Sequence, residues 1–68
     1  MTIGEAMRRA RLKKGYSQTK LSMKTGISLA SISFYENGHV FPSIIQLIPI
    51  ADALGVTLDE LVGRTVGK

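Results

Sequence analysis

The residues whose types and spacing could do chemistry lie between positions 17 and 33. This segment reads as two short helices joined at Thr25-Gly26-Ile27, and each helix follows a serine that can cap it, Ser17 or Ser28. A glycine-terminated helix end, Glu36-Asn37-Gly38, comes directly afterwards. A helix pair of this kind can insert its second helix into the major groove of DNA while the first lies across the phosphate backbone. The pattern therefore indicates contact with nucleic acid.

Catalysis and metal binding are disfavoured by the side chains that the chain contains. There is no cysteine, His39 is the single histidine, and the five acidic residues are scattered. The sequence has no Ser/His/Asp or Cys/His combination and no glycine-rich phosphate loop, and 68 residues scarcely build a cleft that excludes water. We therefore expect no enzymatic activity, no metal and no other cofactor.

Composition and charge describe a small basic domain. The net charge is +4, and no Lys or Arg occurs between Thr25 and Gly63. This balance favours an anionic partner, although it is a weak indication by itself. No apolar run approaches the ~18 residues of a membrane span, so we expect a cytoplasmic protein with no membrane partner. Seven of the nine cations fall in the first 24 residues: Arg8, Arg9, Arg11, Lys13, Lys14, Lys20 and Lys24.

The remaining elements are predicted from capping signals and helical spacing. Residues 1–68 are expected to form a single all-α domain of five helices, with an ordered core over about residues 2–62 and a frayed tail over residues 63–68. The three central helices cover residues 18–24, residues 29–37 and the segment after Ser43 that ends at Gly55. Exposure is expected for Leu12, and Ile32 and Tyr35 are expected to anchor residues 29–37 in the core. Three capping boxes are predicted, at Thr2 and Glu5, at Ser43 and Gln46, and at Thr57 and Glu60.

Pro49 interrupts the apolar rhythm of the fourth predicted helix. A proline in a helix interior deletes one backbone hydrogen bond and costs about 3 kcal/mol. Either the helix kinks at Pro49, or residues 44–48 form a looser first turn. We favour the kink.

In order and spacing, the motifs of residues 11–61 resemble the helix-turn-helix domain of lambdoid phage repressors, their Cro proteins and many XRE-type bacterial regulators. The resemblance covers about four-fifths of the chain, and it implies a compact five-helix, lambda-repressor-like fold. The matching positions are Arg11, Gly15-Tyr16-Ser17-Gln18, Leu21, Gly26-Ile27-Ser28, Ile32-Ser33, Tyr35-Glu36-Asn37-Gly38, Pro42-Ser43, Ile50-Ala51-Asp52-Ala53-Leu54-Gly55-Val56 and Leu58-Asp59-Glu60-Leu61.

The resemblance also implies a function. A member of this family is a sequence-specific regulator of transcription, most often a repressor, that binds double-stranded DNA as a homodimer and is found in the cytoplasm at the nucleoid. No small-molecule ligand is evident. The positions that would read bases are Ser28, Leu29, Ala30, Ser33 and Phe34, and those that would contact phosphates are Gln18, Asn37, Arg11 and Lys20. By resemblance, Arg11 and Glu36 form an internal salt bridge, and the dimer interface comprises Val56, Leu58, Val62 and Val66.

The base-reading positions depart from the usual chemistry of this motif. Guanine is most often read by Arg or Lys and adenine by Asn or Gln, whereas Leu29, Ala30 and Phe34 offer apolar contact with thymine methyl groups. We therefore expect thymines opposite these three residues, with part of the specificity drawn from DNA shape. The following loop, residues 39–41, carries little charge. Few cationic contacts imply a shallow dependence of affinity on salt.

An alternative function uses the same apolar residues. Under this interpretation the fold serves as a protein-interaction or anti-repressor module with weak or no DNA binding. Phe41, Ile44 and Ile48 are nevertheless expected in the core or in a dimer interface, which weakens this alternative. Phe34 discriminates between the two functions. The exposed patch would comprise Phe34, Val40, Phe41, Ile44, Ile45 and Ile48.

Overall fold

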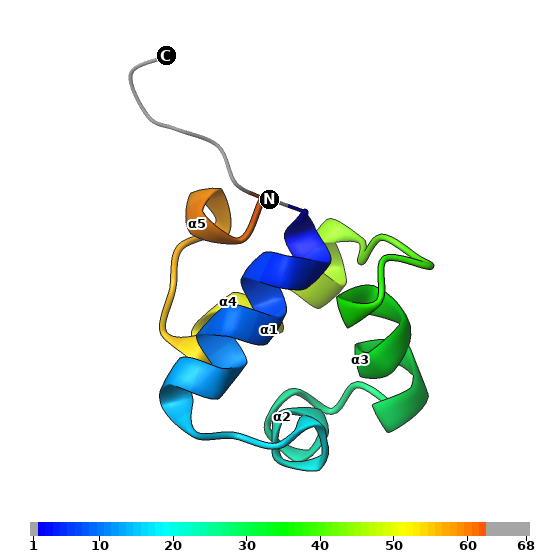
Figure 1. The fold of residues 1–68 in the computed structure, drawn as a ribbon, viewed down its shortest axis with the longest axis vertical. Coiled ribbons are helices and arrows are strands. Elements are labelled where there is room, and N and C mark those ends of the chain that lie inside the picture. The colour runs from blue at the N-terminus through cyan, green and yellow to red at the C-terminus, as the bar shows by residue number, and fades with distance from the viewer. Residues whose placement is uncertain (1, 63–68) are drawn as a thin grey trace.

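In the computed structural model, which describes residues 2–62, the chain folds into five α-helices and the described part contains no strand. No described helix has both the length and the apolar character needed to cross a bilayer. The tail expected over residues 63–68, with Val66, lies outside the described residues. The helices are α1 (Ile3–Lys14), α2 (Gln18–Thr25), α3 (Leu29–Glu36), α4 (Ile44–Leu54) and α5 (Leu58–Val62). Figure 1 shows α1 crossing in front of α4, with α3 and α5 on opposite sides of it.

Two of the three predicted capping boxes are present. At the start of α1 the Glu5 carboxylate accepts the Thr2 backbone N–H at 2.9 Å, and Thr2 Oγ1 accepts the Glu5 N–H at 3.1 Å. The hydrogen bond from the Thr2 backbone lowers the pKa of Glu5 from its ordinary value. At α5, Thr57 donates its N–H to Glu60 at 2.7 Å, and Thr57 Oγ1 accepts the Glu60 N–H at 3.1 Å. These local bonds fix where both helices begin.

The capping box predicted at the start of α4 is wrong. Ser43 makes no side-chain hydrogen bond to the first turn of α4. The backbone N–H of Gln46, which a capping hydroxyl would accept, is bonded instead to the Ser43 carbonyl at 3.0 Å. The Gln46 side chain is half-buried, and its Oε1 has no hydrogen-bond partner. The first turn of α4 is therefore closed by backbone hydrogen bonds alone.

Pro49 lies inside α4, which runs without interruption from Ile44 to Leu54. The looser first turn is therefore not found, and a kink at Pro49 stays a prediction. Because proline has no N–H, the Ile45 carbonyl loses its helical donor. Ile45 is 77% exposed, which places that residue next to water.

The hydrophobic core receives side chains from all five helices. Ile32 and Tyr35 are buried as expected, and Leu12 is exposed as expected. Each CH₂ group that is removed from water contributes about 0.8 kcal/mol to the stability of the fold, and this burial is the main favourable contribution in such a small domain. The buried cluster consists of Met7, Leu21, Ile27, Ile32, Tyr35, Leu47, Ile50, Ala51, Leu54 and Leu61.

Three apolar residues expected in the core or a dimer interface are not in the core. Phe41, Ile44 and Ile48 are 79%, 56% and 49% exposed. The inner face of α4 is formed by the i, i+3, i+4 and i+7 positions that start at Leu47, so its first-turn isoleucines point the other way. Ile44, Ile45 and Ile48 share an exposed side of α4, which we call the α4 apolar face. Phe41 instead lines a hollow with Ile3 and Val62.

Gly4 allows the close approach of α1 and α3. A Cβ atom at this position would meet the backbone carbonyl oxygen of Tyr35, and it would lie 2.7 Å from that of Glu36. Both obstacles are backbone atoms at the end of a helix, so neither can move aside as a flexible side chain could. No pattern in the sequence indicated this role.

We expect Gly4→Ala to destabilise the fold by about 1–3 kcal/mol, because the added methyl group forces α1 away from α3. Urea denaturation followed by circular dichroism measures this change. Arg8→Ala, an exposed substitution on the same helix, should change the free energy of unfolding by about 0.5 kcal/mol or less. Equal stability of Gly4→Ala and the parent protein would contradict the close approach.

Candidate nucleic-acid interface

The turn between α2 and α3 is fixed by hydrogen bonds of the Ser22 and Thr25 side chains. Thr25 Oγ1 donates to the Leu21 carbonyl at 2.8 Å and accepts the Ile27 N–H at 3.2 Å. The Ser22 hydroxyl donates to the Ile27 carbonyl. Gly26 has a φ of 74°, a left-handed conformation that glycine adopts without strain. Because Ile27 is buried, the turn holds α3 in one orientation relative to α2.

Both helices of the pair begin at the serines that the sequence indicated. Ser17 Oγ accepts the Lys20 N–H at 3.0 Å. Ser28 Oγ accepts the Ser31 N–H at 3.1 Å and donates to Ser31 Oγ at 2.9 Å. The Ser28 hydroxyl is therefore already used in capping α3, so a contact to a base would have to share it.

One side of α3 is anchored in the core and the other is open. Ile32 is fully buried, whereas Leu29 is 45% exposed and Phe34 is 50% exposed. Ser28 and Ala30 are also exposed, and Ser33 is half-buried. The five predicted base-reading residues thus gather along one short helix and its cap.

The outer side of α3 carries no charge. Glu36 is the single charged residue of the helix, and it is buried. At the end of the helix, the exposed side chain of Asn37 donates through Nδ2 to Ser33 Oγ at 3.4 Å. The ring of Phe34 meets that of His39 edge to face, with centroids 6.2 Å apart. The exposed surface is therefore apolar and hydroxyl-bearing, with a single amide at its end.

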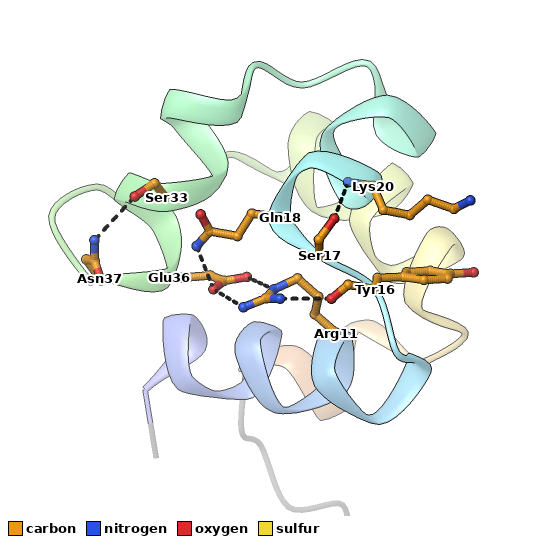
Figure 2. A network of polar contacts seen from close by, with 8 residues as sticks. All are labelled: Arg11, Tyr16, Ser17, Gln18, Lys20, Ser33, Glu36 and Asn37. Carbon is orange, nitrogen blue, oxygen red and sulfur yellow. Dashed lines mark hydrogen bonds and ion pairs between the residues drawn. The ribbon is translucent and has the colours of Figure 1, made fainter.

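A buried carboxylate connects α3 to the elements before it. Arg11 donates to Glu36 through Nε at 2.7 Å and through Nη2 at 3.1 Å, and through Nη1 to the Tyr16 carbonyl at 2.8 Å. Their side chains are only 10% and 2% exposed, and Figure 2 shows the network. The predicted salt bridge is therefore present. Since all three Arg11 nitrogens bind within the protein, its main role is to position α3.

Gln18 joins the same carboxylate, a contact that sequence reasoning missed. Its Nε2 donates to Glu36 Oε1 at 3.1 Å, while its Oε1 points away from Glu36 (Figure 2). The two residues are 18 positions apart, so no local spacing signals the bond. The first residue of α2 is thereby fixed relative to the last residue of α3.

The basic residues of the first 24 positions do not form one surface. Lys20 is exposed on α2, and Lys24 lies with Nζ 5.5 Å from the centroid of the Tyr16 ring. Arg9, Lys13 and Lys14 instead line a cleft between α1 and the connection from α4 to α5. The positive charge near α3 is therefore smaller than the net charge of the whole chain would suggest.

The residues predicted at a dimer interface are only partly accessible. Val56 and Leu58 are half-buried and pack against the core, and Val62 is 38% exposed. Val66 lies outside the described residues. Among residues 2–62, no group of three or more His, Cys, Asp or Glu side chains could hold a metal ion.

The chain belongs to the helix-turn-helix family, whose sequence profile matches residues 7–61. It is 39% identical over 64 residues to the cryptic phage CTXphi transcriptional repressor RstR of Vibrio cholerae, covering 94% of this chain and 57% of RstR. It is 36% identical over 63 residues to the uncharacterised HTH-type transcriptional regulator y4dJ of Sinorhizobium fredii, covering 93% of this chain and 82% of that protein. The chain thus spans little more than half the length of RstR.

Solved structures share the arrangement of the five helices. The P22 c2 repressor, in a crystal structure with synthetic operator 9T, superposes with a TM-score of 0.87 at 29% identity, covering 91% of this chain and 94% of that one. The restriction-modification controller protein C.AhdI of Aeromonas hydrophila gives a TM-score of 0.83 at 29% identity, covering 87% and 89%. The predicted fold and the resemblance to phage repressors are confirmed.

Proposed function

We propose that this protein is a transcriptional regulator, most simply a repressor, that binds double-stranded DNA in a sequence-specific manner. The observation that carries the proposal is the exposed outer side of α3, which is held in place by Ile32 and by the Glu36 network. An α-helix presented in this way fits the major groove of B-DNA. The similarity to RstR and to the operator-bound P22 c2 repressor supports the same function.

Recognition in this proposal depends on apolar contacts. Leu29 and Phe34, each about half exposed, and Ala30 contact thymine methyl groups in the major groove. Ser28 and Ser33 add hydroxyl contacts to bases, although the Ser28 hydroxyl also caps α3 and Ser33 Oγ also accepts from Asn37. Specificity at positions without such contacts comes from the sequence-dependent shape of the DNA.

Contacts to the phosphate backbone orient α3 in the groove. Gln18 and Lys20 bind one strand from the start of α2, where the helix dipole favours an anion. Asn37 binds the other strand from the end of α3. Arg11, 8% exposed, contributes mainly by holding Glu36 and reaches a phosphate at most through its remaining N–H groups.

Selection of bound sites from random duplex DNA tests the proposal. The expected consensus is a pair of half-sites that contain thymines opposite Leu29, Ala30 and Phe34. A G-rich consensus without thymine preference would contradict the assignment of the base-reading residues. Equal binding to all duplexes, or none to any, would contradict the proposed function itself.

The affinity for the selected site should depend only weakly on salt. Lys20 and Lys24 are the cations of α2, and the outer side of α3 has none. Because the slope of log affinity against log salt is about −0.9 per neutralised phosphate, we expect a shallow slope for each domain. A titration of potassium chloride measures it. A slope near that of about 6–10 phosphate contacts per domain would show that other cations bind DNA.

We also propose that the protein binds DNA as a homodimer. The interface comprises Val56, Leu58, Val62 and Val66, and the α4 apolar face is a second surface that could pair with its copy. Light scattering coupled to size exclusion tests dimer formation, and a monomer at high concentration would contradict it. We propose no catalytic step and no cofactor for this protein. We also propose that it is located in the cytoplasm at the nucleoid.

A second candidate function is protein binding in place of DNA binding, as in an anti-repressor module. It is favoured by the exposure of six large apolar side chains on α3, on α4 and in the loop between them. These are Phe34, Val40, Phe41, Ile44, Ile45 and Ile48.

Phe34→Ala separates the two functions. If α3 reads DNA, this substitution should weaken operator binding about tenfold, because losing recognition of one base pair costs about 1–3 kcal/mol. Self-association should be unchanged. Phe41→Ala is the comparison, since Phe41 is 79% exposed and lies outside α3 but within the protein-binding patch. It should leave operator binding unchanged if α3 reads DNA, and it should weaken self-association if the patch binds protein. Unchanged DNA affinity of Phe34→Ala together with weaker self-association would favour the protein-binding function. Fluorescence anisotropy measures the DNA affinity, and light scattering measures self-association.

A further inference from the structure

An open cleft lies between the second half of α1 and the connection from α4 to α5. Its volume is about 810 Å³, and α3 contributes no residue to its lining. In Figure 1 the α4–α5 connection and α3 lie on opposite sides of α1, so this cleft faces away from the proposed DNA-reading helix. The lining residues that define the cleft are Arg9, Leu12, Lys13, Lys14, Val56 and Glu60, with Ala10, Leu54 and Gly55 beneath them.

The lining of the cleft carries three cations, Arg9, Lys13 and Lys14, and one carboxylate, Glu60. The ion pair between Arg11 and Glu36 is the single salt bridge found among residues 2–62, so Arg9, Lys13 and Lys14 make none there. Arg9 and Lys13 are four residues apart and therefore adjacent on one row of α1, where like charges repel. The helix dipole stabilises Lys13 and Lys14 in the last turn of α1, and Arg9 lies four residues after the oppositely charged Glu5 on the same helix.

One acidic side chain, that of Glu60, lines the cleft and is hydrogen-bonded to Thr57. Glu60 Oε1 accepts hydrogen bonds from the Thr57 N–H at 2.7 Å and from Thr57 Oγ1 at 3.2 Å. The described lining therefore has an excess of positive charge, which favours an anionic ligand.

The floor of the cleft is apolar. Leu12 is 57% exposed between the cations of α1, and Val56 is half-buried at the opposite wall. Lys14 lies across Gly55, with Cε 3.3 Å from the place where a Cβ would be, so its long side chain borders the floor. An apolar floor with a cationic rim matches a ligand that combines carboxylates with an apolar side chain.

We propose that this cleft binds an acidic peptide segment of a partner protein, anchored by an apolar side chain between Leu12 and Val56. Carboxylates of the segment contact Arg9, Lys13 and Lys14. Such binding is independent of the outer side of α3 and would bring a second protein to a DNA-bound regulator.

Fluorescence anisotropy with a defined probe tests the proposal. The probe is a fluorescein-labelled synthetic peptide in which leucines alternate with Glu-Asp pairs, and the control peptide carries Gln-Asn pairs in their place. The full chain should bind the acidic peptide and not the control. Amide resonances of Leu12, Gly55 and Val56 should shift on titration. No binding of the acidic peptide would overturn the proposal.

Two matched double variants locate the site. Arg9→Gln/Lys13→Gln should weaken peptide binding about tenfold, whereas Lys20→Gln/Lys24→Gln removes the same charge from α2 and should leave it unchanged. Equal losses in the two variants would mean non-specific attraction and overturn the proposal. Leu12→Ser should also weaken binding, and circular dichroism checks that each variant is folded.

Operator binding separates this proposal from the proposed DNA function. The cleft variant should retain operator affinity, and the α2 variant should lose part of it. If Arg9→Gln/Lys13→Gln weakened DNA binding and left peptide binding intact, these cations would belong to the DNA surface and the peptide site would be wrong. If the peptide bound as expected but no duplex bound, the cleft proposal would stand while the DNA function failed.

Discussion

Glu36→Ala should lower the free energy of unfolding by about 3–5 kcal/mol, because it leaves the buried Arg11 guanidinium without its carboxylate. The same substitution removes the acceptor of the Gln18 amide, so α1, α2 and α3 lose a shared contact. Small domains are stable by only about 5–15 kcal/mol, so this is a large fraction of the total. Urea denaturation followed by circular dichroism measures the loss.

Two controls separate burial from charge. Asp52→Ala removes a carboxylate that is exposed on α4, and it should change stability by about 0.5 kcal/mol or less. Arg11→Met/Glu36→Leu removes both charges together and should be less destabilising than Glu36→Ala, since neither partner is left unpaired. If Glu36→Ala cost no more than Asp52→Ala, the network would not position α3.

Ile32→Ala should destabilise the protein by about 2–5 kcal/mol, because it leaves a cavity where α3 meets the core. Leu29→Ala is the matched substitution on the outer side of the same helix, where the side chain is 45% exposed. Its effect on stability should be about 1 kcal/mol or less. Thermal and urea unfolding of the two variants measures the difference between the two sides of α3.

The effects of Ile32→Ala and Leu29→Ala on operator binding should be in the opposite order to their effects on stability. Leu29→Ala should weaken binding to the selected operator, because a thymine contact is lost. Ile32→Ala, measured at a temperature where it is folded, should bind nearly as well as the parent. Equal loss of stability in both variants would show that α3 is buried all round, and the DNA-reading function would then have no exposed helix to carry it.

Local bonds explain why most helix boundaries could be predicted. The boxes at Thr2 and Thr57 join residues three positions apart, and Gly26 ends α2 through its own backbone conformation. Such signals need no knowledge of the rest of the fold. Ser43 and Gln46 have the same spacing but form no capping box. There the side chain of Gln46 is half-buried, and the tertiary environment decides its position.

The exposure of Ile44 and Ile48 could not be predicted, because the first seven residues of α4 contain one polar side chain. When nearly every position is apolar, helical spacing does not show which side faces inward. Contacts with α1, α2 and α5 turned Leu47, Ile50 and Leu54 toward the core. Ile44 and Ile48 were left exposed for that reason.

The sequence by itself determined five helices, the hinge at Gly26 and the exposed apolar side of α3, since all three follow from spacing within one or two turns. Only the tertiary structure decided that Gln18 binds Glu36 and that Gly4 touches the end of α3. It likewise separated Arg9 and Lys13 from the α2 lysines. These contacts join residues distant along the chain, and the packing of helix against helix sets them, whereas local propensity does not.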